Sequence, residues 1–392
     1  MTTAEIHSTL GGSSAERWQH QHCPGSVHLI EQLGPQPEEN EDCRNDGVAA
    51  HALGARCLTE KVDVWEVLPE YPDLQPDMSN AVQAYLNYAR GLRGERFIEQ
   101  PMKHPAFHPK MFSTLDLAVI EPDPNHWIDG FSVALEIVDY KHGVGVTVDI
   151  EGNWQLMYYG FCFMDGDAWP AGYPRLPDNA LVKLTIAQPR VTWHPDGPIR
   201  SVIMSAGGLR KWAFDELRPA MNRAGTEEYK MGEWCRFCPA KLVCPLMNAL
   251  GDSVKAEVTA KPDLVKVDDG WLDAIYQDIS QMRMFLTAVG KEVSRRALAG
   301  TKFQHAKLVH GVTDRVWKTG APIIEQFASA AWEPPKLISP AKADALPGGK
   351  EFVAEWAEKP EGELQAAPLS DRRKAVAYVS TSEKFAVALA KL

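Results

Sequence analysis

Three extended apolar runs follow one another in the 392-residue chain, and they constrain its fold more than any other feature. They read ERFIEQPM, MFSTLDLAVIE and SVALEIVDYK, over residues 95–102, 111–121 and 132–141. A turn is expected between the last two, at the PDPN of 122–125. Helical patterns cover residues 47–62, 78–93, 151–165 and 205–221. One further strand is expected over residues 180–191. This order predicts an α/β fold with a mixed sheet flanked by helices.

The first part of the chain is expected to form one domain over residues 1–251. It opens with a short helix, because Ser13 and Glu16 have the spacing of a capping box, and this helix is expected to end near Cys23. The polar residues 34–46 are expected to form a loop.

The second part is expected to be an accessory α+β domain over 269–392, joined by a linker at 252–268. Apolar residues spaced by three and four predict a long helix over 271–300, followed by a strand-like stretch over 303–317. The last residues are rich in Ala, Pro, Lys and Glu, and this tail is expected to be partly flexible.

Composition places the chain among soluble globular proteins, with 45% apolar and 24% charged residues. No signal peptide and no membrane span are expected, because no basic residue precedes an early apolar segment and no apolar run can cross a bilayer. The seven cysteines are an odd number, which favours a reducing cytoplasm and thiols that are free or metal-bound.

The net charge of −11 is unevenly distributed. Residues 1–252 carry 21 basic and 34 acidic side chains, whereas residues 253–392 carry 20 basic and 18 acidic ones. An acidic body is not typical of a general nucleic-acid-binding protein, which would show a basic face. Carboxylates gathered around metal ions would also make the first part acidic.

Asp139 and Lys141 are two charged residues inside an otherwise apolar strand. Positions two apart share a face of a strand, so the two side chains are expected to lie side by side. One interpretation is a salt bridge on the solvated face of an edge strand; the other is a metal ligand beside a charge-stabilising lysine. Asp116 lies on the preceding strand, where two carboxylates can share Mg²⁺ or Mn²⁺.

Three further residues extend this group. His51 lies on the 47–62 helix and is a candidate metal ligand, and an imidazole ligand favours Mn²⁺ over Mg²⁺. Gln155 and Tyr159 are four apart on a helix, so they share one face and are expected to point toward the strand ends. For each residue taken singly, an ordinary structural role remains the alternative.

A second candidate site is formed by cysteines. Cys235, Cys238 and Cys244 lie in WCRFCPAKLVCP, with two and then five residues between them, which is typical of a metal centre. The best candidate for a fourth ligand is Cys23, in a Cys-Pro-Gly turn. Cys43 and Cys57 are the alternatives, and Cys162 is assigned to the core. Four thiolates suit structural Zn²⁺ as well as an iron–sulfur cluster.

In their order along the chain, GVAAH (His51), Asp116, DYK (Asp139 to Lys141) and QLMYY (Gln155 to Tyr159) resemble the RecB-like branch of the PD-(D/E)XK nucleases. The resemblance implies a restriction-endonuclease-like core and a metal-dependent DNA nuclease. It implies that His51, Asp116, Asp139 and the carbonyl of Tyr140 ligate the metal, that Lys141 holds the attacking water or the phosphate, and that Gln155 and Tyr159 match the helix motif of that branch.

An early cysteine and a late triplet around this motif resemble the iron–sulfur exonucleases of the same branch. That resemblance implies a 4Fe–4S cluster on Cys23, Cys235, Cys238 and Cys244, with structural Zn²⁺ as the alternative. SSAERWQHQHCPGS, VDYKHGVGVTVDIEGNWQLMYYG and KLVHGVTDRVW are similar to a family of phage-encoded nucleases from replication and recombination modules.

These resemblances imply an exonuclease acting on DNA ends or single strands in the cytoplasm of a bacterial host. Its expected partners are DNA and phage replication or recombination proteins, such as a single-strand-binding protein. DNA contacts are expected from basic residues after the core and from two tryptophans: Lys183, Arg190, Arg200, Arg210, Lys211, Trp193 and Trp212. The alternative function is a non-catalytic DNA-binding or scaffold subunit with a structural metal centre held by four cysteines.

Overall fold

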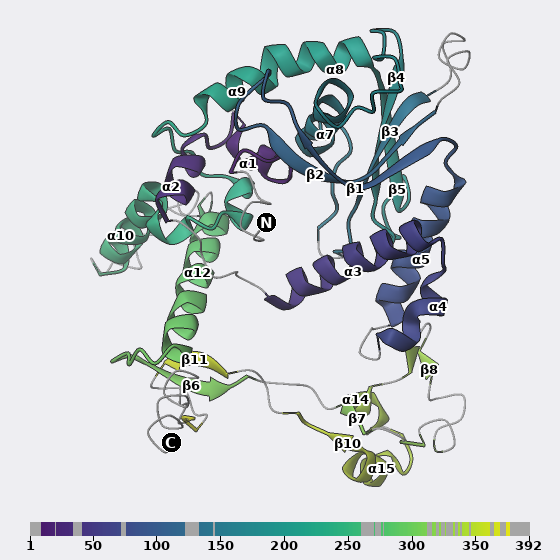
Figure 1. Cartoon of the computed structure of the whole chain (residues 1–392). Coiled ribbons are helices and arrows are strands. Elements are labelled where there is room, and N and C mark those ends of the chain that lie inside the picture. The colour runs from purple at the N-terminus through teal and green to yellow at the C-terminus, as the bar shows by residue number, and fades with distance from the viewer. Residues whose placement is uncertain are drawn as a thin grey trace, which may run out of the picture. The chain divides into compact units, whose positions relative to one another are not determined.

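The computed structural model describes residues 9–19, 21–33, 41–71, 76–121, 133–143 and 146–259 and, with further gaps, residues 270–376. The chain forms two compact units, Met1–Phe285 and Leu286–Leu392. The candidate sites predicted from the sequence all lie in the first unit (Figure 1). None of the helices in the described part is both long and apolar enough to span a membrane.

A five-stranded mixed sheet forms the centre of the first unit, which confirms the predicted α/β architecture. Its strands, in their spatial order, are β1 (Glu95–Lys103), β2 (Phe112–Ile120), β3 (Val133–Tyr140), β4 (Leu181–Ala187) and β5 (Ile199–Ser205). β3 and β4 are parallel, and the other neighbouring pairs are antiparallel. Residues 134–140 of β3 are all buried, as expected for a central strand covered on both faces.

Helices cover both faces of this sheet (Figure 1). α7 (Trp154–Asp165) connects the parallel strands β3 and β4 and packs on one face with α8 (Ala206–Trp212). α3 (Glu41–Glu60), α4 (Val64–Val67) and α5 (Pro76–Gly91) form a second core against the other face. The N-cap of α7 is Asn153, whose side chain accepts a hydrogen bond from the N–H of Leu156.

The remaining elements of this unit are short helices near the N-terminus, the continuation of α8, and the cysteine-bearing segment. They are η2 (Gly12–Ser14), α1 (Ala15–Trp18), α2 (Gly25–Leu33), η3 (Leu68–Glu70), the π-helix η4 (Ala213–Leu217), α9 (Arg218–Arg223), η5 (Glu233–Phe237), η6 (Lys241–Val243) and α10 (Pro245–Thr259).

The boundary between the two units falls within α12 (Ile279–Leu298). The second unit contains two-stranded pairings of β6 with β11, β7 with β10 and β8 with β9, and a small core of Ala343, Phe352 and Val353. Its elements are β6 (Ala306–His310), β7 (Val316–Trp317), β8 (Trp332–Glu333), β9 (Lys336–Leu337), α14 (Pro340–Ala343), α15 (Gly349–Trp356), β10 (Ala357–Glu358) and β11 (Leu364–Pro368).

Three features differ from the sequence predictions. α3 begins at Glu41, within the predicted loop, and α10 continues to Thr259, within the predicted linker. β5 was not expected; it is an edge strand with a half-exposed, weakly apolar pattern. The predicted turn at 122–125 and the linker residues 260–268 lie outside the described residues.

Candidate functional site

Asp116 and Asp139 lie on neighbouring strands, as the sequence predicts. β2 and β3 pair from Leu117 opposite Val138, so the two aspartates occupy the next facing position of the same register. The Oδ2 atom of Asp116 accepts a 2.7 Å hydrogen bond from the backbone N–H of Tyr140. This bond fixes one carboxylate beside the end of β3, next to the Tyr140 carbonyl group.

His51 reaches the same place from α3. Its Nδ1 atom is 3.3 Å from Oδ1 of Asp116, and its ring lies edge-on to the Tyr140 ring with centroids 5.3 Å apart. Burial by itself would lower the pKa of His51, but the Asp116 carboxylate outweighs this effect and raises it. The predicted His51–Asp116 pair is therefore assembled, with the imidazole oriented by a carboxylate.

Glu99 is a member of this site that the sequence analysis missed. Among the described residues, His51, Glu99 and Asp116 form the group whose ligand atoms all lie within 4.8 Å of one another. β1 pairs Ile98 with Leu117 and Gln100 with Leu115, which leaves Glu99 facing Asp116 without a ladder pair. Desolvation, followed by the Asp116 charge, raises the pKa of Glu99 to about 7.

The backbone of Glu99 has φ of 45°, a left-handed conformation that is unfavourable for a residue with a side chain. This conformation accompanies the missing ladder pair. The register of the three strands aligns Asp139, Asp116 and Glu99 in one row, and this register is the signal that would have identified Glu99.

Asp139 belongs to a hydrogen-bonded network with Lys141 and two residues of α7. Lys141 Nζ lies 2.9 Å from Oδ2 of Asp139 and donates to Oε1 of Gln155 at 2.9 Å. The Gln155 amide nitrogen donates to Oδ1 of Asp139 and to the Tyr159 hydroxyl, each at 2.9 Å. The four residues predicted to act together are therefore in direct contact.

The exposure of this network is uneven. The Asp139 side chain is 2% exposed and that of Lys141 is 27% exposed, and Gln155 is also partly exposed, so a ligand in solvent would meet the lysine and the glutamine. Burial raises the pKa of Asp139, an effect that Lys141 opposes. Burial would lower the pKa of Lys141, but the Asp139 and Asp116 carboxylates raise it overall, which keeps the lysine charged.

Tyr140, whose carbonyl is a predicted ligand, is held through its side chain. Its ring stacks on Tyr85 with centroids 4.8 Å apart, and its hydroxyl lies 3.0 Å from Nδ1 of His142. His142 Nε2 is 3.0 Å from Arg190, which in turn donates to Asp77 of α5 at 2.6 Å. This chain of contacts ties the end of β3 to α5.

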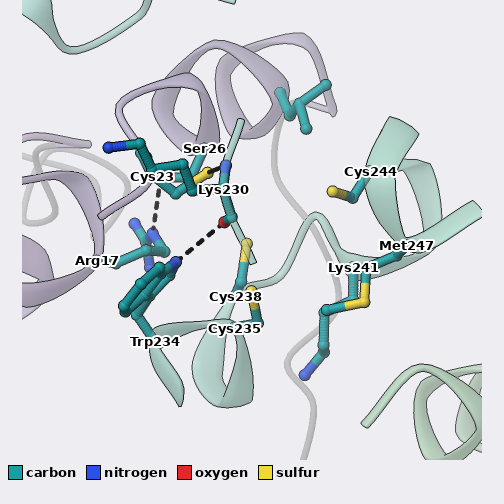
Figure 2. A pocket seen from close by; sticks show the side chains of 11 residues that line it. Arg17, Cys23, Ser26, Lys230, Trp234, Cys235, Cys238, Lys241, Cys244 and Met247 are labelled. Carbon is teal, nitrogen blue, oxygen red and sulfur yellow. Dashed lines mark hydrogen bonds between the residues drawn. The ribbon is translucent and has the colours of Figure 1, made fainter. Parts of the chain in front are cut away.

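The cysteine site joins segments far apart in the sequence. The backbone N–H of Gly25 donates to the Glu228 carbonyl at 2.9 Å, and a Cβ at Gly25 would approach the Tyr229 ring to 2.5 Å. The Lys230 N–H donates to Sγ of Cys23 at 3.5 Å (Figure 2). Because only glycine fits this approach, the turn after Cys23 can lie directly against the segment that leads to Cys235.

Cys23, Cys235, Cys238 and Cys244 all line one pocket (Figure 2). Burial raises the pKa of Cys23 and of Cys238, and raises that of Cys235 to about 11. Burial therefore favours the protonated form of these three thiols, and a bound metal ion would have to displace their protons. Of the alternative fourth ligands, Cys57 of α3 is buried in the core that α3 forms with α5, and the side chain of Cys43 lies outside the described residues. Cys162 of α7 is buried in the core, as assigned from the sequence.

The donor set of this pocket fits a thiolate-bound metal centre. Four thiolates around one zinc ion, at Zn–S distances of about 2.3 Å, place the sulfur atoms about 3.8 Å apart. In the described part of the chain, no three of the four sulfurs lie within 4.8 Å of one another. Figure 2 shows Cys244 apart from the other three, across the pocket. The spacing is thus wider than a single zinc ion requires.

The basic residues expected to contact DNA are paired within the protein. Lys183 bonds the Tyr88 hydroxyl, Lys211 pairs with Asp215, and Arg190 and Arg210 have the carboxylate partners Asp77, Asp165 and Asp178. Arg200 is 3% exposed and donates to backbone carbonyls. Trp212 packs on Trp154, whereas Trp193 is 62% exposed. Of this predicted set, Trp193 and Lys211, whose side chain is 78% exposed beside Asp215, are therefore the residues most open to solvent.

Comparison with protein families gives one match, to the family described as protein of unknown function (DUF2800). The match spans residues 7–374 and thus includes both candidate sites and most of the second unit. The chain is a member of the DUF2800 family.

Proposed function

We propose that this protein is a divalent-metal-dependent deoxyribonuclease of the RecB-like PD-(D/E)XK type. The observation that carries the proposal is the group of His51, Glu99 and Asp116 beside the Asp139–Lys141 pair of the neighbouring strand. Asp139 itself lies outside the group whose ligand atoms are within 4.8 Å of one another. The sequence resemblance to the RecB-like nuclease branch also rests on His51, Asp116, Asp139 and Lys141. The restriction-endonuclease-like core is part of the proposal, supported by the mixed sheet with its β3–α7–β4 crossover.

The charges of the site support the metal requirement. Glu99 and Asp116 lie together with His51, Asp139 faces Asp116 from the neighbouring strand, and Lys141 is the one permanent cation among these groups. Without added cations, this arrangement would repel a phosphodiester. Carboxylate oxygens and a neutral imidazole suit Mn²⁺ or Mg²⁺, which would be held by His51, Asp116, Asp139 and the Tyr140 carbonyl, with Glu99 as an additional ligand.

The metal ion, Lys141 and Gln155 would have different roles in hydrolysis. A divalent ion in this site would lower the pKa of bound water and stabilise charge on the phosphate. Lys141, the cation of its network and 27% exposed, would bind the attacking oxygen or a phosphate oxygen through its ammonium group. Gln155 accepts from Lys141 and donates to Asp139, so it fixes the distance between the cation and its carboxylate.

A metal centre on Cys23, Cys235, Cys238 and Cys244 is the second part of the proposal. The wide spacing of the sulfurs favours a 4Fe–4S cluster over zinc. Protein purified without oxygen should then be brown, with absorbance near ~400 nm. Colourless protein with one bound zinc ion would favour the alternative metal. The iron–sulfur exonucleases that the sequence resembles favour an exonuclease on DNA ends or single strands, acting in the host cytoplasm with phage replication proteins.

Cleavage of end-labelled linear DNA, single- and double-stranded, tests the proposal in Mn²⁺, Mg²⁺ or EDTA, beside closed circular DNA. Asp139→Asn should lower the cleavage rate by about 100- to 1,000-fold, because it weakens a ligand and unpairs Lys141. The matched control is Asp165→Asn, which removes a carboxylate paired with Arg210 outside the site. Cutting of the circle would indicate an endonuclease. No cleavage by folded, metal-loaded protein would favour the non-catalytic scaffold.

A further inference from the structure

Arg17 of α1 is a cation at the cysteine pocket with no acidic partner in the described part of the chain. Its side chain lines the pocket together with the four cysteines (Figure 2). Its Nε donates to the Ser26 hydroxyl at 3.3 Å, and no described carboxylate lies within 4.0 Å of its guanidinium group. Other partly buried arginines of this unit, such as Arg190 and Arg210, pair with aspartates.

The surroundings of Arg17 show which charge it faces. Burial lowers the pKa of Arg17, while Cys238 and Cys23 are the groups that raise it. The Arg17 carbonyl also accepts a hydrogen bond from the N–H of Cys23 at 3.0 Å, so the arginine and this cysteine are fixed relative to each other. The guanidinium group is therefore held beside two of the four proposed thiolate ligands.

The charge of a metal centre supplies the reason for such a cation. Four thiolates bring about −4, and either Zn²⁺ or an oxidised 4Fe–4S core returns about +2, so the occupied pocket keeps an excess near −2. An uncompensated buried charge is costly, and its cost falls when an opposite charge is held close by. This requirement is the same for zinc and for an iron–sulfur cluster.

We propose that Arg17 is a positioning residue for the cysteine metal centre, where its guanidinium group offsets the excess negative charge of the bound thiolates. This inference rests on the metal centre proposed above and is independent of nuclease activity. Lys230 and Lys241 also line the pocket, but their Nζ atoms donate to the carbonyls of Gln21 at 3.3 Å and Arg236 at 3.0 Å. Arg17 is thus the cation placed to face the sulfur atoms.

Metal release from the full-length protein tests the role of Arg17. Wild type, Arg17→Gln, Arg17→Lys and Arg236→Gln are purified without oxygen, and loss of iron or zinc to a chelator is followed over time. Arg236 is the matched control, because it lies between Cys235 and Cys238 but is exposed, with its guanidinium over the Phe237 ring at 5.7 Å. Arg17→Gln should release metal about 10-fold faster, and Arg17→Lys should stay close to wild type.

A second measurement separates charge from folding. If the metal is an iron–sulfur cluster, Arg17→Gln should lower its reduction potential, because the reduced, more negative cluster loses a nearby cation. Equal release and equal potential in wild type and Arg17→Gln would overturn the role of Arg17, as would an equally large effect of Arg236→Gln. Should Arg17→Gln not fold, fast release from Arg17→Lys would overturn the charge argument. Wild type that binds no metal would overturn the metal centre itself.

Discussion

The two proposed metal sites are held together in different ways. Asp116 and Asp139 face each other in the register of neighbouring strands, and a backbone N–H and α7 side chains fix their carboxylates. The cysteine pocket instead joins Cys23 to a segment more than 200 residues later, and the Lys230–Cys23 hydrogen bond spans 207 positions. The first site is thus built by the sheet, whereas the second depends on a long-range closure.

This difference predicts different roles for the two metals. In the carboxylate site, His51, Glu99 and Asp116 already lie within 4.8 Å of one another, so an ion adds chemistry and changes the fold little. In the cysteine pocket, raised thiol pKa values oppose the thiolate form, and only a small apolar cluster with Leu29 and Ala240 accompanies Cys238. Metal binding there would add directly to folding stability.

The largest expected effect is on folding stability, from Cys235→Ala. Loss of this ligand opens a loop of about 210 residues, which by analogy with a disulfide costs about 5 kcal/mol. Chemical unfolding of metal-loaded protein measures the loss. The control is Cys57→Ala, a buried core cysteine outside the pocket. Chelator should destabilise wild type and Cys57→Ala but leave Cys235→Ala unchanged; equal chelator sensitivity of all three would break the comparison.

A smaller effect is expected from Gln155→Ala in the carboxylate site. It removes the amide that bridges Asp139, Lys141 and Tyr159 and leaves buried polar groups without a partner, at a cost of about 1–3 kcal/mol. DNA cleavage should fall by about 10-fold, while chelator-dependent stability from the cysteine site stays unchanged. Tyr159→Phe, which removes one bond and keeps the ring, should have the weaker effect. A stability loss without any change in cleavage would assign Gln155 a purely structural role.

The mixed sheet and most of the carboxylate site could be predicted from the sequence, because both follow from local patterns. The apolar run around Asp139 predicts a buried strand, and spacing by two or four residues places Lys141 and Tyr159 correctly relative to their partners. Glu99 was missed because its role depends on strand register and on an unusual φ, which a single strand pattern does not reveal.

The surface was predicted less well than the core, for the same reason. Arg200 and Lys183 look like free cations in sequence, but each has a partner that only tertiary structure supplies: backbone carbonyls for Arg200, and Tyr88 with Glu136 for Lys183. The cysteines of the pocket could be identified from the sequence, because the spacing of Cys235 and Cys238 is a local pattern. The position of Arg17 beside this pocket could not be predicted, because it depends on contact between the N-terminal segment and residues 228–238.

The smallest expected effect is on folding stability, from Glu99→Gln, and its size depends on pH. The pKa of Glu99 is raised to about 7, so its contribution to stability is greatest below the ordinary glutamate pKa and is lost as pH rises through 7. Without metal, Glu99→Gln should therefore stabilise the protein at pH 8, by up to about 1 kcal/mol because solvent screens this exposed carboxylate, and the gain should shrink toward pH 5.

Thermal unfolding in EDTA and in Mn²⁺ measures this effect. Added Mn²⁺ should raise the melting temperature of wild type more than that of Glu99→Gln, because the variant lacks one carboxylate ligand. Glu95→Gln on the same strand is the control, since Glu95 accepts from the Tyr173 hydroxyl outside the site. If Glu99→Gln destabilised the metal-free protein at pH 8, Glu99 would serve the fold rather than a metal. The carboxylate site would then resemble the cysteine pocket in coupling its ligands to stability.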